Sequence, residues 1–228
     1  MKKRIWHVSD SHTYHRLLVV PKNVDIVIFS GDCSNPRDPY TNEPEVRNFL
    51  TWFAALPIKH KIFVAGNHDT SIEKKLITKI DFVARNIIYL ENDYCFVDDL
   101  KIFGTPYTPS FGMGWAFNKA RNKMHDKIWS HVEDDTDIII SHGPPKYILD
   151  LSTDMSHNLE FCGCSSFFKL CKKLKPKLVC FGHIHDNDDI CNSGIKQIAG
   201  LDTIFSNGSI VKDGEFGKLI SNGNIIEI

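Results

Sequence analysis

The chain has 228 residues, a net charge of −1, 42% hydrophobic residues and 24% charged residues, which is an ordinary composition for a globular protein. The near-neutral charge excludes a generally basic surface for nucleic acid or anionic membranes, and no apolar run approaches the roughly 20 residues of a transmembrane helix. Polar residues follow the basic start too soon for a secretion signal, so we expect one cytoplasmic domain over residues 1–228. The seven cysteines contain no Cys-x-x-Cys pair and therefore lack the usual spacing for structural zinc.

The first third of the chain alternates apolar runs with a helical pattern. Residues 4–9, 24–30 and 61–65 are short, apolar and β-branched, which is typical of buried strands. Three prolines predict an irregular loop over 31–44. Apolar residues at three-four spacing predict a helix over 45–56.

Further helices and shorter strands are expected beyond residue 69. A helix capped by Thr70 or Ser71 should run to Arg85, with its inward face formed by Leu76, Ile80 and Val83. The later elements expected are strands at 87–90, 94–97, 100–103, 137–141 and 177–181, a turn at 98–99, a loop at 105–117, helices at 118–131 and near 160–174, and short strands with turns after 194. Alternating strands and helices followed by meandering strands predict two layered sheets with helices outside.

Polar side chains follow the ends of five of these apolar runs. Gly66-Asn67-His68-Asp69 follows the strand at 61–65, and Gly182-His183-Ile184-His185 follows the strand at 177–181. The carboxyl ends of strands in α/β proteins form the sheet edge where ligands usually bind. The candidate metal ligands at these ends are Asp10, His12, Asp32, Asn67, His142, His183 and His185.

The chemistry of this set points to transition metals. Carboxylate, amide oxygen and imidazole nitrogen without thiolate suit Mn, Fe or Zn better than Ca or Mg. Seven ligands are too many for one tetrahedral ion, but they match two ions that share a bridging carboxylate, as in two-metal hydrolytic sites. Taken alone, most of these short motifs are more often ordinary turns or loops than functional sites. Even the strongest of them has only about an even chance of being functional. Five of them at successive strand ends make coincidence a poor explanation.

The order D-x-H, G-D, G-N-H-D/E, H and G-H-x-H resembles the calcineurin-like metallophosphoesterases. Narrower similarities at 53–57, 104–106, 115–118, 141–145 and 203–209 resemble the metallophosphoesterase-domain-containing subfamily of metallophosphodiesterases. The resemblance implies an α/β (α+β) fold, a four-layer αββα sandwich of two mixed β-sheets flanked by helices, known as the metallo-dependent phosphatase fold. It also implies a dinuclear metal centre at the strand ends.

The resemblance further implies a role for each matched residue. One ion would be held by Asp10, His12 and His185, the other by Asn67, His142 and His183, with Asp32 bridging them. His68 would steady the transition state or protonate the leaving alkoxide, and Asp69 would orient its imidazole. The expected nucleophile is a hydroxide that bridges the ions. Two divalent ions are expected as cofactors, Mn²⁺ first, with Fe, Zn or Mg as alternatives.

Substrate contacts are expected from Asn67, His68, Arg37, Trp115 and Asn118. Trp115, Phe117 and Asn118 offer a wall on which a nucleobase can stack, whereas packing of Trp115 and Phe117 between the sheets is the alternative. Among the other histidines, His7 is expected to be packed or half-exposed within its strand rather than catalytic. His15 is weighed as an additional site residue against an ordinary place in the loop.

The expected activity is hydrolysis of small phosphodiesters, with cyclic nucleotides as the first candidates. A phosphomonoesterase acting on nucleotides or phosphoproteins is the alternative within the same chemistry. A catalytically silent scaffold is the alternative from another class, and intact His68 and Asp69 speak against it. The expected partner is a small phosphoester, without a membrane or an extended nucleic-acid surface, and the oligomeric state is left open.

Overall fold

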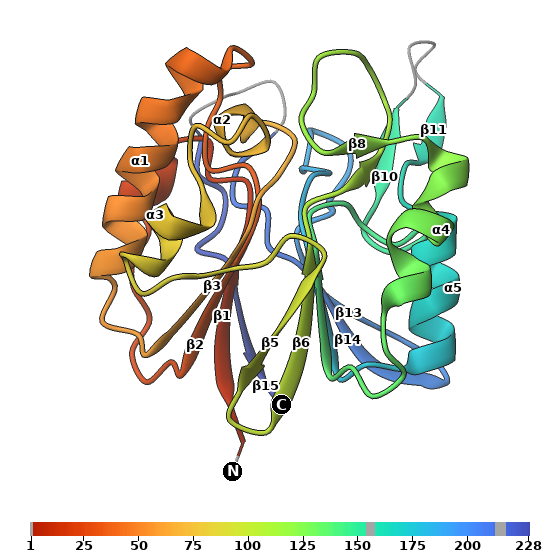
Figure 1. Ribbon diagram of the computed structural model, residues 1–228. Coiled ribbons are helices and arrows are strands. Elements are labelled where there is room, and N and C mark those ends of the chain that lie inside the picture. The colour runs from red at the N-terminus through yellow and green to blue at the C-terminus, as the bar shows by residue number, and fades with distance from the viewer. Residues whose placement is uncertain (1, 154–157, 213–217) are drawn as a thin grey trace.

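Two mixed β-sheets face each other in the computed structural model, which describes residues 2–153, 158–212 and 218–228 (Figure 1). The first sheet has the order β15-β1-β2-β3-β4 and consists of β15 (Asn224–Glu227), β1 (Arg4–Val8), β2 (Ile26–Ser30), β3 (His60–Val64) and β4 (Ile88–Tyr89). The second has the order β13-β14-β12-β9-β6-β5 and consists of β13 (Gly194–Ile198), β14 (Leu201–Asn207), β12 (Leu178–Phe181), β9 (Ile138–Ser141), β6 (Leu100–Thr105) and β5 (Asp93–Val97). Neighbouring inner strands run parallel, so their carboxyl ends lie at one edge of each sheet.

Helices cover the two outer faces of this pair of sheets. The first sheet is covered by α1 and α3 and the second by α4 and α5 (Figure 1). The helical segments are α1 (Pro39–Ala55), α2 (Thr70–Glu73), α3 (Lys79–Val83), α4 (Met124–Lys127), α5 (Ser165–Leu174) and the 3₁₀ turns η1 (Tyr14–Leu17), η2 (Arg121–Lys123) and η3 (Trp129–His131). Two small ribbons complete the fold, β7 (Thr108–Pro109) with β8 (Asn118–Lys119) and β10 (Leu151–Thr153) with β11 (Leu159–Phe161). The predicted four-layer αββα sandwich is confirmed.

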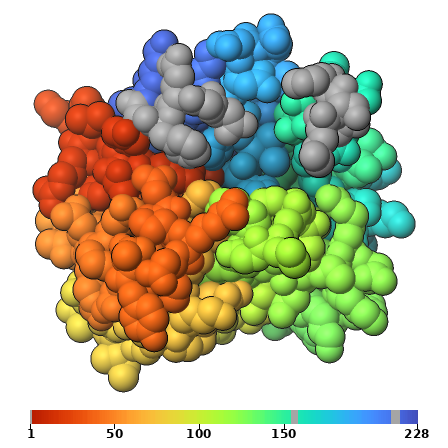
Figure 2. All heavy atoms as spheres, turned by 90° about the horizontal axis from the view of Figure 1, so that it is seen from above, coloured from red at the N-terminus to blue at the C-terminus, as the bar shows by residue number. Residues whose placement is uncertain are grey.

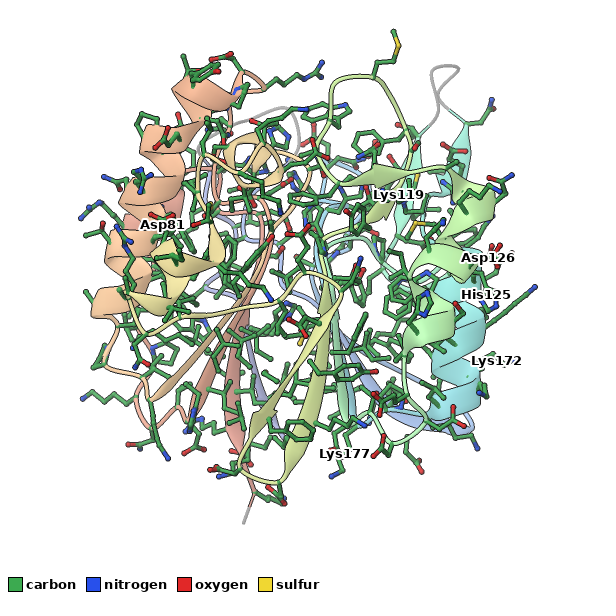
Figure 3. All side chains as sticks on the ribbon, viewed as in Figure 1. Asp81, Lys119, His125, Asp126, Lys172 and Lys177 are labelled. Carbon is green, nitrogen blue, oxygen red and sulfur yellow. The ribbon has the colours of Figure 1, made fainter. Side chains whose placement is uncertain are left out.

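The apolar runs are continuous because the central strands are buried on both faces. Ile28 of β2 and Ile140 of β9 belong to the cluster between the sheets, while Phe29 packs with Phe49 of α1 on the outer side. The second sheet has its own outer cluster, in which Phe167 of α5 stacks on Trp129. Side chains therefore fill all three layer boundaries (Figure 3). None of the helices in the described part of the chain has the length and apolar character that crossing a bilayer requires.

The predicted strands lie within one or two residues of their expected bounds, but two predicted helices begin at other residues than expected. The loop expected over 31–44 is helical from Pro39, because the Asp38 carboxylate accepts a hydrogen bond from the Thr41 amide and proline suits the first helical position. Pro44 lies inside α1 at the cost of one intrahelical hydrogen bond. The helix near 160–174 begins only at Ser165, because β11 occupies its first residues.

The helix expected from Thr70 or Ser71 to Arg85 is broken into α2 and α3. Lys75 has a φ of 61°, which ends the first helix, and a capping box starts the second. The break changes which side chains face inward. Leu76 is half-buried, the predicted inward positions Ile80 and Val83 are 79% and 74% exposed, and Ile72, Ile77 and Phe82 are buried instead.

The single helix expected over 118–131 is also wrong. This segment consists of β8, η2, α4 and η3, because Ile128 leaves the helical region with a φ of −126°. Met124, Ile128 and Trp129 are nevertheless buried together under α5. Their four- and five-residue spacing produced the helical pattern without a continuous helix.

His7 links the two sheets below the strand ends. Its buried imidazole lies 2.9 Å from the Ser30 hydroxyl of β2 and 2.7 Å from the Ser206 hydroxyl of β14. Burial lowers the pKa of His7 to about 3. His7 is thus packed, one of the two expected placements, and the folded protein holds this imidazole neutral.

Acidification should therefore destabilise the fold through His7. The unfolded chain takes up this proton near pH 6.5 and the folded chain only near pH 3, so stability is lost as the pH falls through this window, by about 1.4 kcal/mol per pH unit. Between pH 7 and pH 5, urea unfolding in EDTA should show the wild type losing about 2 kcal/mol more than His7→Gln. Equal losses in the two proteins would show that His7 is not held neutral.

Candidate metal centre

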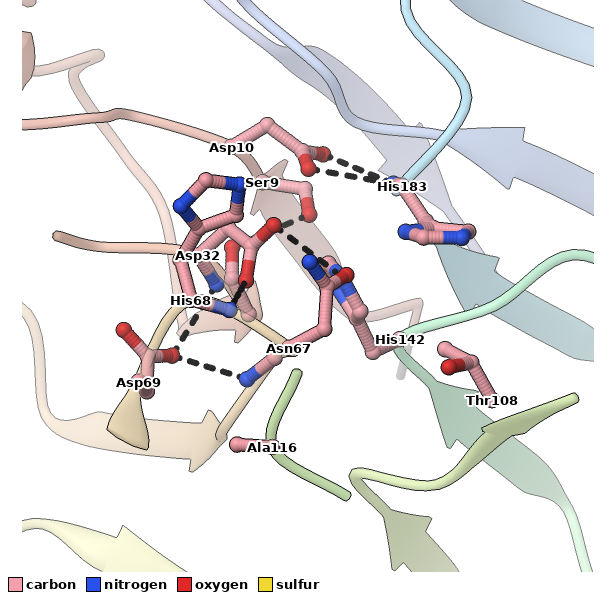
Figure 4. A network of polar contacts seen from close by, with 12 residues as sticks. Ser9, Asp10, Asp32, Asn67, His68, Asp69, Thr108, Ala116, His142 and His183 are labelled. Atoms are coloured by element: carbon pink, nitrogen blue, oxygen red, sulfur yellow. Dashed lines mark hydrogen bonds and ion pairs between the residues drawn. The ribbon is translucent and has the colours of Figure 1, made fainter. Parts of the chain in front are cut away.

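The strand ends that carry the predicted ligands meet at one edge of the sandwich (Figures 1 and 4). Four of these residues have left-handed backbone conformations, with φ values of 53° at Asp10, 41° at His12, 61° at Asp32 and 71° at His183. Each such non-glycine residue costs of the order of 1–3 kcal/mol, and this kind of strain gathers at functional sites. The backbone is therefore bent so that the side chains converge.

The first group of side chains consists of Asp10, His12 and His185, which are all buried and bring ligand atoms within 4.8 Å of one another. The His185 Nε2 atom lies 3.1 Å from Asp10 Oδ1. Burial raises the pKa of Asp10, but the His185 and His142 imidazoles outweigh this effect and hold the pKa at about 2. Asp10 is therefore ionised at neutral pH, as a carboxylate that is to hold a metal must be.

The second group consists of Asp32, His142 and His183 within the same distance of one another. His142 Nδ1 donates to the Ser30 carbonyl oxygen at 2.8 Å, which turns Nε2 toward Asp32 Oδ2 at 3.3 Å and Asn67 Oδ1 at 2.8 Å (Figure 4). Burial lowers the pKa of His142, but the Asp32 carboxylate outweighs it and raises the pKa to about 9. A bound cation would take the place of this proton.

Asp32 connects the two groups. Its carboxylate belongs to the second group and also lies within 4.8 Å of ligand atoms of His12 and His68. Burial raises the pKa of Asp32, whereas His142, His68 and His12 lower it further, so the carboxylate is ionised. All seven predicted ligands are thus brought together in the structure. Six of them are buried and His183 is half-buried, and their oxygen and nitrogen donors fit a metal site.

Glycines allow this close approach. A Cβ atom at Gly66 would overlap Asp32 Oδ1 and lie 2.7 Å from His142 Cε1, and one at Gly182 would overlap the Asp10 carboxylate and the Ser9 hydroxyl. The ligands therefore fill the space in which these two residues would otherwise carry side chains.

Gly66→Ala should consequently push Asp32 and His142 out of place. We expect metal affinity to fall by about 10- to 100-fold, the range for lost support of a metal ligand, as measured by competition with a chelator. Gly112→Ala is the matched control, because its Cβ would meet Trp115 only at an ordinary 3.4 Å. Unchanged affinity in Gly66→Ala would contradict the packing described here.

His68 lies beside both groups without belonging to the predicted ligand set. Its backbone N–H donates to Asp32 Oδ1 at 2.7 Å, and its imidazole lies 4.8 Å from that of His12. The Nδ1 atom lies 2.9 Å from the Asn35 carbonyl oxygen, which can only accept a hydrogen bond. Nδ1 therefore carries a proton, and Nε2 is the atom left for proton exchange with a substrate.

Asp69 makes different contacts from those expected. Its carboxylate accepts hydrogen bonds from the backbone N–H groups of Asp32, Cys33 and Gly66 at 3.0, 3.1 and 2.8 Å and from the Ser34 hydroxyl at 2.8 Å. Figure 4 shows Asp69 beside the loop of Asp32. The partner of the His68 imidazole is Asn35 instead. Asp69 thus fixes the loop that carries Asp32, and sequence reasoning missed Asn35 because a backbone carbonyl leaves no sequence signal.

The predicted substrate residues separate in the structure. The Arg37 guanidinium lies 3.7 Å from the centre of the Trp115 ring, and that ring lies 4.5 Å from His68, so both border the metal centre. Phe117 is buried in the outer cluster beside α1 and Trp115 is only half-buried, so the alternative in which both pack between the sheets is wrong. The Asn118 amide donates to the Ala116 carbonyl and holds its own loop. Contacts of Arg37, Trp115 and Asn118 with substrate stay predictions.

His15 lies outside the metal groups. Its buried imidazole packs against Phe49 and Trp52 of α1 at 5.2 Å, and Nε2 lies 3.1 Å from Asn48 Oδ1. Burial lowers the pKa of His15 to about 4. His15 is therefore not an additional residue of this centre, and its imidazole serves in packing against α1.

Comparisons with known proteins agree with this geometry. The chain is 29% identical over 210 residues to human "metallophosphoesterase domain-containing protein 1", covering 82% of this chain and 62% of that relative, so it spans less than two thirds of the relative's length. The crystal structure of TT1561 from Thermus thermophilus has a TM-score of 0.62 at 14% identity, covering 91% of this chain and 89% of that one. A further crystal structure has a TM-score of 0.68 at 15% identity, covering 100% and 99%. The latter two show a shared fold.

A family profile decides the assignment. The profile described as calcineurin-like phosphoesterase matches residues 3–187, a range that contains all seven candidate ligands and His68. With buried Asp and His groups at the strand ends of a two-sheet sandwich, the chain belongs to the calcineurin-like phosphoesterase family.

Proposed function

We propose that this protein is a metal-dependent phosphodiesterase that hydrolyses small diesters, with cyclic nucleotides as the first candidates. The observation that carries the proposal is the position of Asp32, whose carboxylate lies within 4.8 Å of ligand atoms of His12 in the first group and of His142 and His183 in the second. Two divalent ions sharing this carboxylate, Mn²⁺ first, suit the mixed oxygen and nitrogen donors. Bound there, they would supply Lewis acidity toward a phosphoester.

Two protein side chains would supply the proton for the leaving group and a further positive charge. His68 faces the shared carboxylate with Nδ1 fixed by Asn35, so Nε2 is placed to give a proton to the leaving oxygen. Arg37, stacked on Trp115, adds a positive charge at the border of the centre. The positive charges of Arg37 and of the two divalent ions together favour an anionic phosphate as substrate.

The decisive experiment is an assay of the purified protein with Mn²⁺. Bis-p-nitrophenyl phosphate and the 2′,3′- and 3′,5′-cyclic nucleotides test diesterase activity, and p-nitrophenyl phosphate tests monoesterase activity in the same preparation. We expect turnover of the diesters to exceed that of the monoester. Absence of turnover with every diester would overturn the proposal, and faster monoester turnover would favour a phosphomonoesterase.

A further inference from the structure

A cavity opens beside the metal centre, on the side of His183. It has a volume of about 350 Å³ and is lined by the apolar side chains of Phe111, Pro144 and Ile184 together with the polar side chains of Ser152 and Glu160. His183 itself forms part of its wall. This volume is at the lower end of the range for small-molecule sites, so the cavity has room for one ring-sized group.

A chain of ring contacts connects the cavity with the opposite side of the centre. His68 lies 4.5 Å from Trp115, Trp115 lies 5.7 Å from Phe111, and Phe111 lies 4.8 Å from His183. His68 and His183 therefore stand at the two ends of the site, with the aromatic pair between them. The loop that carries this pair, between β7 and β8, rises beside the β10–β11 ribbon in Figure 1, and Figure 2 looks down on this end of the molecule.

The charges in the cavity wall oppose each other. Arg121 donates from both terminal nitrogens to the carbonyl oxygens of Gly163 and Cys162, at 2.8 and 3.1 Å, which holds the outer wall in place. Glu160 brings one negative charge to the same cavity. Neither sign is in surplus, so the wall favours an uncharged group over an anionic one.

We infer that this cavity receives the ester arm that stays on phosphorus during hydrolysis, and that Phe111 selects an uncharged, ring-containing arm. The inference rests on the proposed function and adds a substrate class to it. In the reaction, oxygen from water forms a bond to phosphorus, the bond from phosphorus to the leaving oxygen breaks, and His68 supplies a proton to that oxygen. The proton that the water releases replaces the one that His68 has given up. The leaving group must therefore lie at the His68 end, which leaves the His183 end for the retained arm.

The retained arm explains how the site would distinguish diesters from monoesters. A monoester has no second arm and leaves the apolar cavity filled only with water, whereas a diester with a ring-sized second arm fills it. Filling or emptying a hydrophobic pocket changes discrimination by about 10- to 200-fold in enzymes. The cavity thus gives the diester preference a physical origin separate from the metal ligands.

Two substrates with the same leaving group isolate this effect. Bis-p-nitrophenyl phosphate retains a nitrophenyl arm and methyl p-nitrophenyl phosphate retains a methyl arm, while both release nitrophenolate. For the wild type we expect kcat/KM to be at least about 10-fold higher for the nitrophenyl arm. Phe111→Ala should lower this ratio by about 3- to 10-fold, the range for one lost aromatic contact.

A cavity-filling variant provides the second test. Ser152 lies opposite Glu160 in the β10–β11 ribbon, and Ser152→Phe should block the cavity and bring the ratio near one. Phe96→Ala is the control, because Phe96 is also an exposed phenylalanine, at 70%, and lies on β5 at the edge of the second sheet. Ratios in Phe111→Ala and Ser152→Phe equal to the wild-type ratio would overturn the inference and leave the phosphodiesterase proposal standing.

A binding measurement separates the two proposals if turnover fails. Phenyl phosphate and methyl phosphate are the products that diesters with these retained arms would leave in the site. Calorimetric titration of the Mn²⁺-loaded protein should show phenyl phosphate binding about 10-fold more tightly than methyl phosphate, with the difference lost in Ser152→Phe. This result would support the cavity assignment even if neither diester were hydrolysed. Equal affinities for the two phosphates in the wild type would contradict it.

Discussion

Asp32→Asn is expected to remove tightly bound metal and to lower phosphodiester turnover by at least about 10³-fold, more than the loss of one transition-state hydrogen bond causes. The substitution keeps the size of the side chain and an oxygen that can accept the His68 N–H, so the loop need not move. It removes the negative charge that lies next to His12 of the first group and within the second group. Elemental analysis and steady-state kinetics on the same preparation measure both effects.

A surface carboxylate serves as the control for this variant. Asp81 lies on α3 on the outer face of the sandwich (Figure 3), where Asp81→Asn removes the same charge from an ion pair with Arg47. Metal content and turnover should stay at wild-type values in Asp81→Asn. Wild-type metal content in Asp32→Asn, with the fold intact by circular dichroism, would show that Asp32 does not bridge two sites.

His68→Ala should have the second largest effect, a loss of about 10²- to 10⁴-fold in kcat with metal content unchanged. The physical reason is the fixed imidazole, whose Nδ1 donates to Asn35 and whose Nε2 is left for the substrate. Because no ligand is removed, metal retention separates this loss of chemistry from a damaged centre. His125→Ala on the outside of α4 (Figure 3) is the control and should behave as wild type.

The leaving group distinguishes the two roles considered for His68. Nitrophenolate leaves without protonation far more readily than an aliphatic alkoxide does, so a general acid matters less for it. If His68 donates a proton, His68→Ala should lose much more activity with a 2′,3′-cyclic nucleotide than with bis-p-nitrophenyl phosphate. Equal losses with both substrates would show that His68 stabilises the charge of the transition state instead.

The strand ends were predictable because two local signals coincide there. Buried parallel strands appear in the sequence as short apolar runs, and parallel pairing brings their carboxyl ends to one edge whatever separates them along the chain. Asp10 and His185 could therefore be placed together from sequence even though they lie at opposite ends of the family match. The two layered sheets followed from a different signal, the change from alternating strands and helices to meandering strands, and the four-layer sandwich from the family resemblance.

The parts that could not be predicted depend on tertiary contacts. Met124, Ile128 and Trp129 have helical spacing but lie on separate short turns, because packing under α5 decides their backbone. Asn35 positions His68 through a backbone carbonyl, which any residue type provides. Phe111 is an ordinary loop aromatic in the sequence, and its contacts with Trp115 and His183 in the folded protein connect it with the site.

The most direct test of the central claim is the metal content of the purified protein. After loading with Mn²⁺ and dialysis against metal-free buffer, elemental analysis should find two equivalents per chain in the wild type and a large deficit in Asp32→Asn. Two equivalents would establish that Asp32 joins two groups of ligands around a pair of ions. Retention of no metal by the folded wild-type protein would contradict the whole account of the strand ends as a metal centre.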